Sequence, residues 1–260
     1  MRLKSLINSI KALAKLDALA NSTKITRFNS LLPMKIDVVE NLMNGKYKLL
    51  IGTKLLETKS NLKLEVGESY WGEMKEDMKT KNLSLSNLLK QPKLLKHLKH
   101  IPKFSTEKLA DILTKENPKL ELKTTLLEHL SKSTSKSEFM TTTSMVNALE
   151  QNVFTFVMSQ NGKEAIFQFK KRSPKKSSKT ELENTKIDFY AAFENLGPVE
   201  GVVEVKDEVK SLSLYLYYEN SVKFLLRELN NLDFNAKIYK KDKKIEPLFY
   251  VSPNLLDIRG

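Results

Sequence analysis

The last third of the chain alternates apolar and polar side chains in a way that constrains the fold more than any other feature. Apolar residues recur at every second position over 187–193, 203–206 and 212–217, which is the period of strands that bury one face. Over 222–232 the period changes to i, i+3, i+4 and i+7, which is typical of a helix with one apolar side. A returning strand is expected at 235–239. The helix places these residues on its apolar side, over the sheet: Val222, Leu225, Leu226, Leu229 and Leu232.

Strand patterns also dominate residues 30–80. Short apolar or alternating runs at 47–51, 54–58 and 62–66 are bordered by Asn44-Gly45, Gly52, Asn61 and Gly67, which is typical of hairpins. Trp71, the only tryptophan of the chain, follows these runs. Because aromatic side chains gain much free energy from burial, we expect Trp71 to lie beneath the small sheet rather than on the surface.

Between these regions the pattern becomes helical. Leucines recur over 82–129, and Pro92, Pro102 and Pro118 divide that stretch into short helices. Residues 131–143 are rich in Ser, Thr and Lys, as linkers are. The predicted fold class is therefore α+β, in four segments: an amphipathic helix and linker at 1–29, a small β-rich module at 30–80, a helical segment and linker at 81–143, and a C-terminal α+β domain at 144–260.

A hairpin opens the C-terminal domain. Residues 153–157 and 165–169 flank Asn161-Gly162, a strong two-residue turn signal. The basic tract 170–179 follows, and it has too few apolar residues to hold a fixed shape. We expect a mobile basic loop there, with a nucleic-acid patch as the alternative.

The N-terminal segment has leucine and isoleucine at helical spacing, with basic residues between them. Lysines interrupt the apolar run that a cleavable signal would need. A helix docked on the protein's own core is the favoured interpretation. A membrane-surface helix and an uncleaved export segment are the alternatives.

The chain is strongly basic, with 44 Lys and Arg against 31 Asp and Glu, a formal charge of +13. This balance fits an acidic partner, a nucleic acid or simple solubility. Lys90, Lys93, Lys96 and Lys99 recur every three residues in the predicted helical segment. A solvated helix face is favoured for these lysines, and a docking site for phosphate or an acidic protein is the alternative.

No pattern of catalytic or ligand-binding residues is found. Cysteine is absent, and the three histidines, His97, His100 and His129, have no carboxylate at metal-ligand spacing. The sequence also lacks a phosphate-binding glycine loop and a nucleophile elbow. We therefore expect a non-enzymatic protein with no catalytic residue, no metal and no cofactor.

The C-terminal pattern resembles one known family. Over 153–239 the order is hairpin, basic tract, strand, Leu196-Gly197-x-Val199, strand, amphipathic helix and final strand, which is similar to the C-terminal switch domain of flagellar hook-length control proteins. Residues 48–73 resemble a small strand-rich module of shorter relatives. The chain lacks the long Pro/Gln/Ser-rich segment of that family, so a switch-domain relative or paralogue is the expected type.

The resemblance implies a component of flagellar type III export. Such proteins act in the cytoplasm at the membrane-associated export apparatus, or pass through it. They contact the cytoplasmic domain of the export-switch membrane protein and change substrate choice from hook to filament components. The predicted partner-binding residues on this chain are Leu196, Gly197, Val199, Gly201, Tyr215 and Tyr217.

The residues themselves also support two parts of this prediction, the glycine and the tyrosines. Gly197 would permit a positive φ or a close backbone approach. Tyr215 and Tyr217 lie on the strand face opposite the leucines, where they are either covered by the 153–169 hairpin or exposed as anchors for a partner. The alternative function is a nucleic-acid-binding protein that stacks bases on these tyrosines and holds phosphates with the basic tract 170–179.

Overall fold

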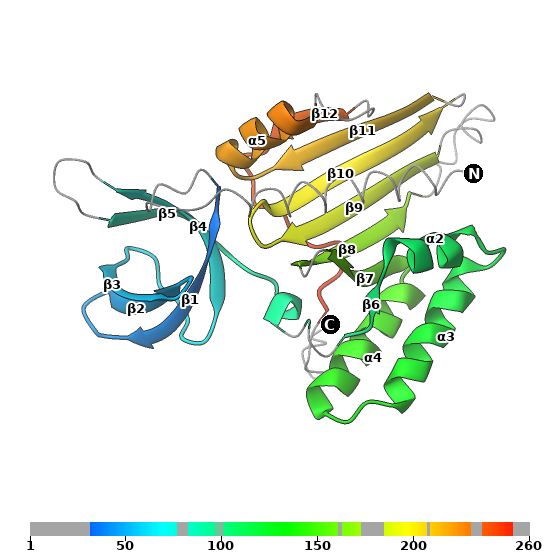
Figure 1. The fold of residues 1–260 in the computed structure, drawn as a ribbon, viewed down its shortest axis with the longest axis horizontal. Coiled ribbons are helices and arrows are strands. Elements are labelled where there is room, and N and C mark those ends of the chain that lie inside the picture. Colours follow the sequence, from blue (N-terminus) through cyan, green and yellow to red (C-terminus); the bar gives the residue numbers. More distant parts are fainter. Residues whose placement is uncertain are drawn as a thin grey trace.

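The computed structural model describes residues 32–76, 83–96, 98, 101–160, 163–172, 185–206, 209–229 and 236–251. These residues form two β-sheets and four α-helices. The smaller sheet lies at one end of the molecule, and the larger sheet carries the helices (Figure 1). The α+β class predicted from the sequence is confirmed.

The smaller sheet is antiparallel and has its own core. Its strands are β1 (Met34–Asn41), β2 (Lys46–Ile51), β3 (Lys54–Lys59), β4 (Ser69–Glu76) and β5 (Leu83–Lys90), in the spatial order β3-β2-β1-β4-β5. Asn44 and Gly45 connect β1 to β2 with φ angles of 51° and 72°, which asparagine and glycine adopt most readily. Alternate side chains such as Ile36 and Leu49 form the core of this unit, which we call the β-module.

The larger sheet has two parallel edge strands around an antiparallel centre. Its strands are β6 (Lys103–Phe104), β7 (Val153–Gln160), β8 (Lys163–Lys171), β9 (Thr185–Phe193), β10 (Gly197–Lys206), β11 (Val209–Leu216) and β12 (Ala236–Lys240), in the spatial order β12-β11-β10-β9-β8-β7-β6. Strands β6 and β12 run parallel to β7 and β11, and the other pairs are antiparallel.

The two faces of this sheet differ because successive side chains of a strand point to opposite sides. One face carries buried apolar side chains such as Phe167, Val199 and Leu214, and we call it the core face. The other carries a row of cross-strand partners from β8 to β12, and we call it the tyrosine face. That row is Gln168, Tyr190, Glu200, Tyr215 and Tyr239.

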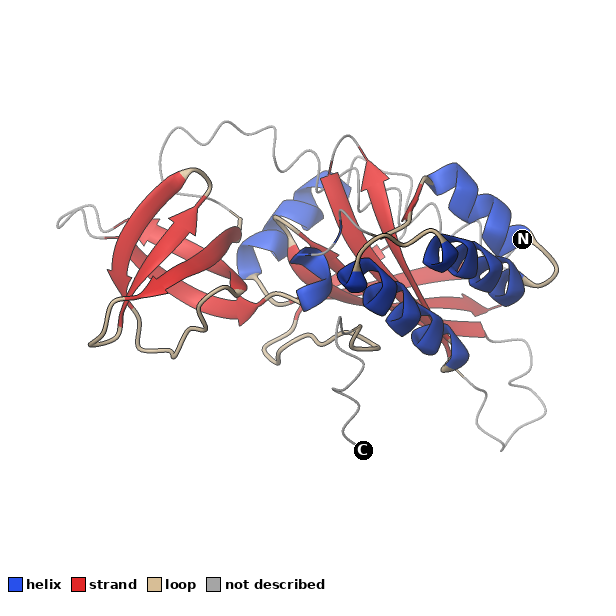
Figure 2. Cartoon of the chain, turned by 90° about the horizontal axis from the view of Figure 1, so that it is seen from below, coloured by secondary structure: helices blue, strands red, loops and turns tan. Residues whose placement is uncertain are grey.

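The helices pack at the two ends of the larger sheet. They are α2 (Thr106–Thr114), α3 (Pro118–Ser131), α4 (Lys136–Glu150) and α5 (Glu219–Leu229), and a short 3-10 helix, η1 (Lys93–Lys96), follows β5. Helix α4 packs against β7 and α3, α2 packs against β6 and α3, and α5 packs against β11 and β12 (Figure 2). No helix among the described residues is both long enough and apolar enough to cross a membrane.

The predicted strand–helix–strand order of the C-terminal domain is observed. Strands β9, β10 and β11 are followed by α5 and β12, and α5 buries Val222 and Leu225 in the core. Leu226 was predicted on the same apolar side but is 48% exposed, because the contact with the sheet covers a narrower stripe of the helix than the sequence indicates. Leu232 lies outside the described residues.

The predicted helical stretch over 82–129 was wrong at its start. Residues Leu83–Lys90 form strand β5, paired with β4, and the following lysines lie on η1 rather than on an α-helix. The sequence Leu83-Ser84-Leu85-Ser86 has the period of a strand, and this signal was missed. The β-module therefore extends past residue 80, to Lys90.

The predicted linker at 131–143 was also wrong, because helix α4 begins at Lys136. Ser135 accepts a hydrogen bond from the Glu138 backbone N–H, and a Glu138 side-chain oxygen accepts one at 3.1 Å from the Thr134 N–H. This cap resembles a capping box, which allows a Ser/Thr-rich segment to start a helix. Since β6 joins the larger sheet, the domain boundary lies before Lys103 rather than at residue 143.

Several predictions fall outside the described residues. The amphipathic helix at 1–29, the turn Asn161-Gly162, tract residues 173–179, Lys99, His97 and His100 are all in this group. Within the described part, the tract begins as the end of β8.

Two side chains connect the β-module to the larger sheet. Trp71 in β4 is 1% exposed, so its predicted burial is observed, but it packs in the core of the larger sheet and not beneath the small sheet as expected. Its indole N–H donates a hydrogen bond of 2.9 Å to the Phe193 carbonyl in β9. The Tyr218 hydroxyl, just before α5, donates a hydrogen bond of 3.0 Å to the Asn87 carbonyl in β5. Asn87 has a φ of 53° beside a register shift in the β4–β5 pairing, as bulged strand residues often do.

We expect Tyr218→Phe to lower the free energy of unfolding by about 0.5–1.5 kcal/mol, because it removes one hydrogen bond and leaves the part-buried Asn87 carbonyl unpaired. Urea denaturation would measure the change. The adjacent Tyr217→Phe is the matched control, since the Tyr217 hydroxyl makes no hydrogen bond within the described part of the chain. Equal stability of the two variants would contradict this role of Tyr218.

Candidate functional site

The corner where β10 begins is formed by the predicted Leu196-Gly197 pair. Gly197 has a φ of +77°, and a Cβ at that position would lie 2.8 Å from ring atoms of Tyr218. Both predicted reasons for glycine therefore apply at this one residue. Leu196 is fully buried, and its carbonyl accepts a hydrogen bond of 3.0 Å from the Ser221 hydroxyl in α5. The corner thus joins the start of β10 to the start of α5.

Val199 and Gly201 continue into the interior. Val199 is fully buried, and a Cβ on Gly201 would lie 2.1 Å from the Phe189 ring of the neighbouring strand. The four predicted partner-binding residues Leu196, Gly197, Val199 and Gly201 are therefore structural in this conformation, and they present no side-chain surface to a partner. The Leu196-Gly197-x-Val199 pattern therefore indicates how the domain packs and not where a partner binds.

Tyr215 lies on the tyrosine face and contacts the edge strand. Its ring is stacked on that of Tyr239, its register partner in β12, with ring centroids 5.3 Å apart and an interplanar angle of 22°. Tyr215 is half-buried and Tyr239 is 43% exposed. Tyr217 instead packs edge-on against Tyr218, 5.0 Å between centroids. The prediction that the hairpin covers these tyrosines was wrong, because β7 and β8 are strands of the same sheet.

Carboxylates on the tyrosine face are paired with cations. Glu200 lies beside Tyr215 and forms an ion pair with Lys241, which follows β12. Further along the same face, Lys186 pairs with Glu204 at 2.7 Å, and Arg172 pairs with Asp188 at 2.7 Å. The hydrogen bond from Arg172 to Asp188 is the main reason that the pKa of the guanidinium is raised. Lys170 and Lys237, which the strand register places on the same face, have no ion pair among the described residues.

A segment after β12 crosses the tyrosine face, and we call residues 241–251 the C-terminal strap. The Lys241 backbone N–H donates to the Leu216 carbonyl at 2.8 Å, which holds the start of the strap. Further along, the Gln168 side chain donates to the Phe249 carbonyl at 2.7 Å and accepts from the Phe249 N–H at 3.1 Å. These two hydrogen bonds between a side-chain amide and the backbone resemble those between neighbouring strands, and they attach the strap to the tyrosine face.

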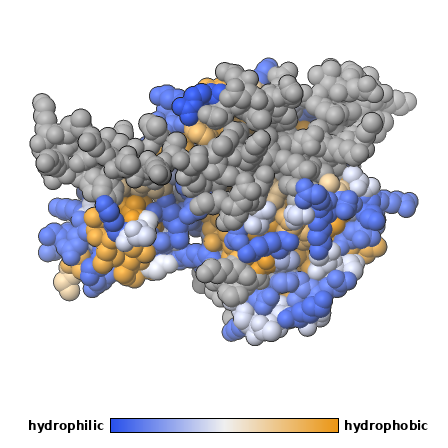
Figure 3. Space-filling view, in the orientation of Figure 1, coloured by the Kyte–Doolittle hydropathy of each residue, from blue (hydrophilic) through white to orange (hydrophobic). Residues whose placement is uncertain are grey.

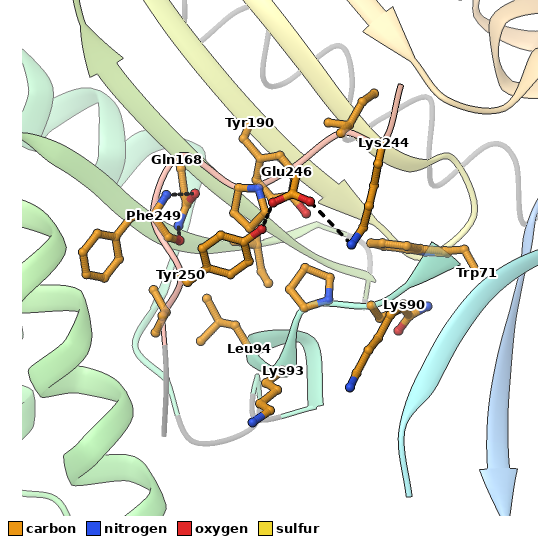
Figure 4. A pocket seen from close by; sticks show the side chains of 16 residues that line it. Trp71, Lys90, Lys93, Leu94, Gln168, Tyr190, Lys244, Glu246, Phe249 and Tyr250 are labelled. Atoms are coloured by element: carbon orange, nitrogen blue, oxygen red, sulfur yellow. Dashed lines mark hydrogen bonds and ion pairs between the residues drawn. The ribbon is translucent and has the colours of Figure 1, made fainter. Parts of the chain in front are cut away.

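A cleft of about 320 Å³ lies between the strap, the tyrosine face and the segment that leaves the β-module. Figure 4 shows side chains from these three parts of the fold around it, with those of Lys93 and Phe249 pointing outward. We call it the junction cleft, and its lining is Trp71, residues 90–94, Ile166, Gln168, Tyr190 and residues 244–247 and 249–251. The C-terminal strap was not predicted, because its sequence shows neither strand nor helix period.

The pKa values of two tyrosines and one glutamate in the cleft are shifted. Burial raises the pKa of the Tyr190 phenol. Burial, followed by a hydrogen bond to Glu246, raises the pKa of Tyr250 to about 12. The same hydrogen bond is the first cause of the lowered pKa of Glu246. Both tyrosines therefore stay protonated in neutral solution.

The predicted series of lysines does not lie on one helix, because its members belong to different elements. Lys90, at the end of β5, pairs with Glu65 at 2.7 Å, and Lys96 on η1 pairs with Glu68 at 2.7 Å. Lys93 has no ion pair among the described residues and lines the junction cleft. The series is neither a single solvated helix face nor a single docking stripe.

His129 is placed by a local contact rather than by a metal site. Its imidazole lies 3.1 Å from Glu138, where α3 meets α4. Within the described residues, no group of three or more His, Asp or Glu side chains has the geometry to hold a metal ion.

The β-module exposes an apolar surface of its own. Large side chains there are exposed at Val39, Met43, Leu55, Leu62 and Val66. Figure 3 shows apolar surface over β1 to β3 on the face turned toward the viewer. None of these side chains lines the junction cleft or belongs to the stacked tyrosine pair.

Comparisons of the chain with protein-family models, with curated proteins and with solved structures found no match. The functional proposal therefore rests on the geometry of the chain and on the resemblance of its C-terminal pattern.

We expect Gly201→Ala to lower the free energy of unfolding by about 1–3 kcal/mol, because the new methyl group would overlap the Phe189 ring in a packed core. Chemical denaturation would measure it. Gly52→Asn is the control, since Gly52 has a φ of +62° that asparagine tolerates and nothing lies within 4 Å of its Cβ position. A Gly201→Ala chain as stable as the control would contradict the packing role.

Proposed function

We propose that the chain is a non-enzymatic component of flagellar type III export, resembling the switch domain of hook-length control proteins. In this proposal it binds the cytoplasmic domain of the export-switch membrane protein at the export apparatus and changes substrate choice. The observation that carries the proposal is the β10–β11–α5–β12 unit, which has the element order of the resemblance and an aromatic pair at its open edge.

The surface that fits a protein partner is the tyrosine pair Tyr215–Tyr239. Tyrosines contribute much to protein interfaces because a large rigid ring is buried at a small loss of side-chain entropy. The pair is bordered by the Glu200–Lys241 ion pair, so an aromatic centre has a polar rim, as in many interfaces.

Strand β12 adds a backbone component to this surface. It is the last strand of the sheet order, and within the described residues its outer edge has no strand partner. Lys237 and Lys240 lie on this strand, and lysines at an edge disfavour nonspecific strand pairing. A partner with acidic side chains would meet both the lysines and the free edge.

Binding of a single-stranded nucleic acid fits the described geometry less well. Stacking on Tyr215 would place a phosphate chain along a face that carries Glu200, Glu204 and Asp188. The cations beside these carboxylates form ion pairs, whereas Lys170 and Lys237 on the same face have none among the described residues. It is the three carboxylates that make the described part of the tyrosine face less favourable to a phosphate chain than to a protein partner.

The test is a calorimetric titration of the whole chain with the cytoplasmic domain of the export-switch protein from the same organism. We expect saturable binding that Tyr215→Ala/Tyr239→Ala weakens at least about tenfold, since aromatic interface centres commonly contribute that much. Phe139→Ala is the control, because Phe139 is a 45% exposed aromatic residue on α4.

Circular dichroism and urea denaturation would first show that each variant is folded. Absence of binding by the folded wild-type chain would contradict the proposed function. Equal affinity of the double variant and the control would contradict the assignment of the tyrosine pair. Tight RNA binding that falls steeply with salt and is lost in the double variant would favour the nucleic-acid alternative.

A further inference from the structure

The junction cleft contains a buried polar group that the fold leaves without a partner. Gln91 follows β5 and is 4% exposed, and its side-chain nitrogen has no hydrogen-bond partner. Its backbone N–H is held by the Ser69 carbonyl at 2.8 Å, so the chain here is fixed by β4. An unpaired buried amide destabilises a protein by about 1–3 kcal/mol, and such groups are uncommon in native structures unless a water, an ion or a functional role accounts for them.

A second polar group lies on the opposite wall. It is the Tyr190 hydroxyl, on a side chain that is 2% exposed. Because the phenol stays protonated, it can donate a hydrogen bond to an anion. Two neutral donors therefore border the same cleft.

The rim of the cleft is basic. Lys90, Lys93 and Lys244 line it, and their side chains are drawn with those of Glu246 and Tyr250 in Figure 4. Lys90 is paired with Glu65, and Lys244 lies 3.5 Å from Glu246. Lys93 has no ion pair within the described residues, so its charge is the one most available to a bound anion.

The remaining walls of the cleft are apolar and include the Trp71 ring. Leu94, Ile166 and Ile245 line the cleft together with the buried indole of Trp71. A volume of about 320 Å³ is at the lower end of small-ligand sites, roughly 300–1,000 Å³. The cleft can thus take an apolar body of limited size.

We propose that the junction cleft binds an apolar or aromatic carboxylate, whose carboxyl group is held by the Gln91 amide within the basic rim and whose apolar part packs beside Trp71. The ligand is a free carboxylic acid or the carboxyl-terminal residue of a peptide, which share this chemistry. The proposal goes beyond export switching, because the cleft is distinct from the tyrosine pair.

A larger hollow of about 580 Å³ lies on the other side of the same connection and is also lined by Gln91. Two of its carboxylates already have cationic partners: Asp37 lies 3.1 Å from Lys35, and Glu164 pairs with Lys103. It therefore offers neither a free cation among these groups nor a continuous apolar wall. The junction cleft fits an amphipathic anion better.

The only tryptophan of the chain makes the test direct. Trp71 lines the cleft, so its fluorescence reports occupancy. Titration of the whole chain with N-acetylphenylalanine is expected to give a saturable change. The amide N-acetylphenylalaninamide has the same apolar body without the carboxylate, and we expect it to bind at least about tenfold more weakly.

Two variants assign the binding groups. Lys93→Glu is expected to weaken binding at least about fivefold, whereas Lys132→Glu makes the same charge change at the exposed end of α3 and should leave it unchanged. Gln91→Leu should also weaken binding at least about fivefold without lowering the free energy of unfolding, because it removes an unpaired donor.

The results distinguish a peptide end from a small-molecule acid, and they can contradict the proposed site. Binding of an octapeptide that ends in phenylalanine, but not of its C-terminal amide, identifies a peptide end; binding of the free acid alone identifies a small molecule. No saturable change in the folded chain, equal affinity for the acid and its amide, or equal effects of Lys93→Glu and Lys132→Glu would overturn the proposal. None of these results depends on the export-switch titration.

Discussion

The contact between Gly197 and the ring of Tyr218 holds together three parts of this protein. Only a residue without a side chain can start β10 there, because a Cβ would lie 2.8 Å from the ring. The same ring is buried, and its hydroxyl reaches the Asn87 carbonyl in the β-module. Since Leu196 beside it binds Ser221 of α5, one corner positions the sheet, the helix and the neighbouring module.

The two faces of the larger sheet have different roles: one packs the core, and the other leaves side chains accessible. The core face is filled by aromatic and aliphatic side chains, such as the stacked Phe156 and Phe167, whose centroids are 5.7 Å apart. The tyrosine face has ion pairs, an exposed aromatic pair and the C-terminal strap. Partner-binding residues are therefore expected on the tyrosine face, where side chains remain accessible, and not at the buried Leu196-Gly197 corner.

The C-terminal strap gives the tyrosine face two separate regions. On one side lies the tyrosine pair at the edge strand, and on the other lies the junction cleft against the β-module. Gln168, which itself lines the cleft, holds the strap there, because its amide makes both hydrogen bonds with Phe249. A protein partner and a small carboxylate could thus occupy the same sheet face without sharing a residue of the two sites.

The sequence by itself determined the local elements whose period is unbroken. The alternation around Phe189 and Leu214 predicts their strands, and Gly197 predicts an unusual backbone, because these properties depend on neighbours along the chain. The tertiary structure decided what sequence period cannot encode. Tyr218 fills the space left by Gly197, and Gln91 becomes an unpaired amide in a cleft between distant segments. Such features arise from contacts between residues far apart in the chain, so only the packed fold determines which groups are buried together and which remain free to bind.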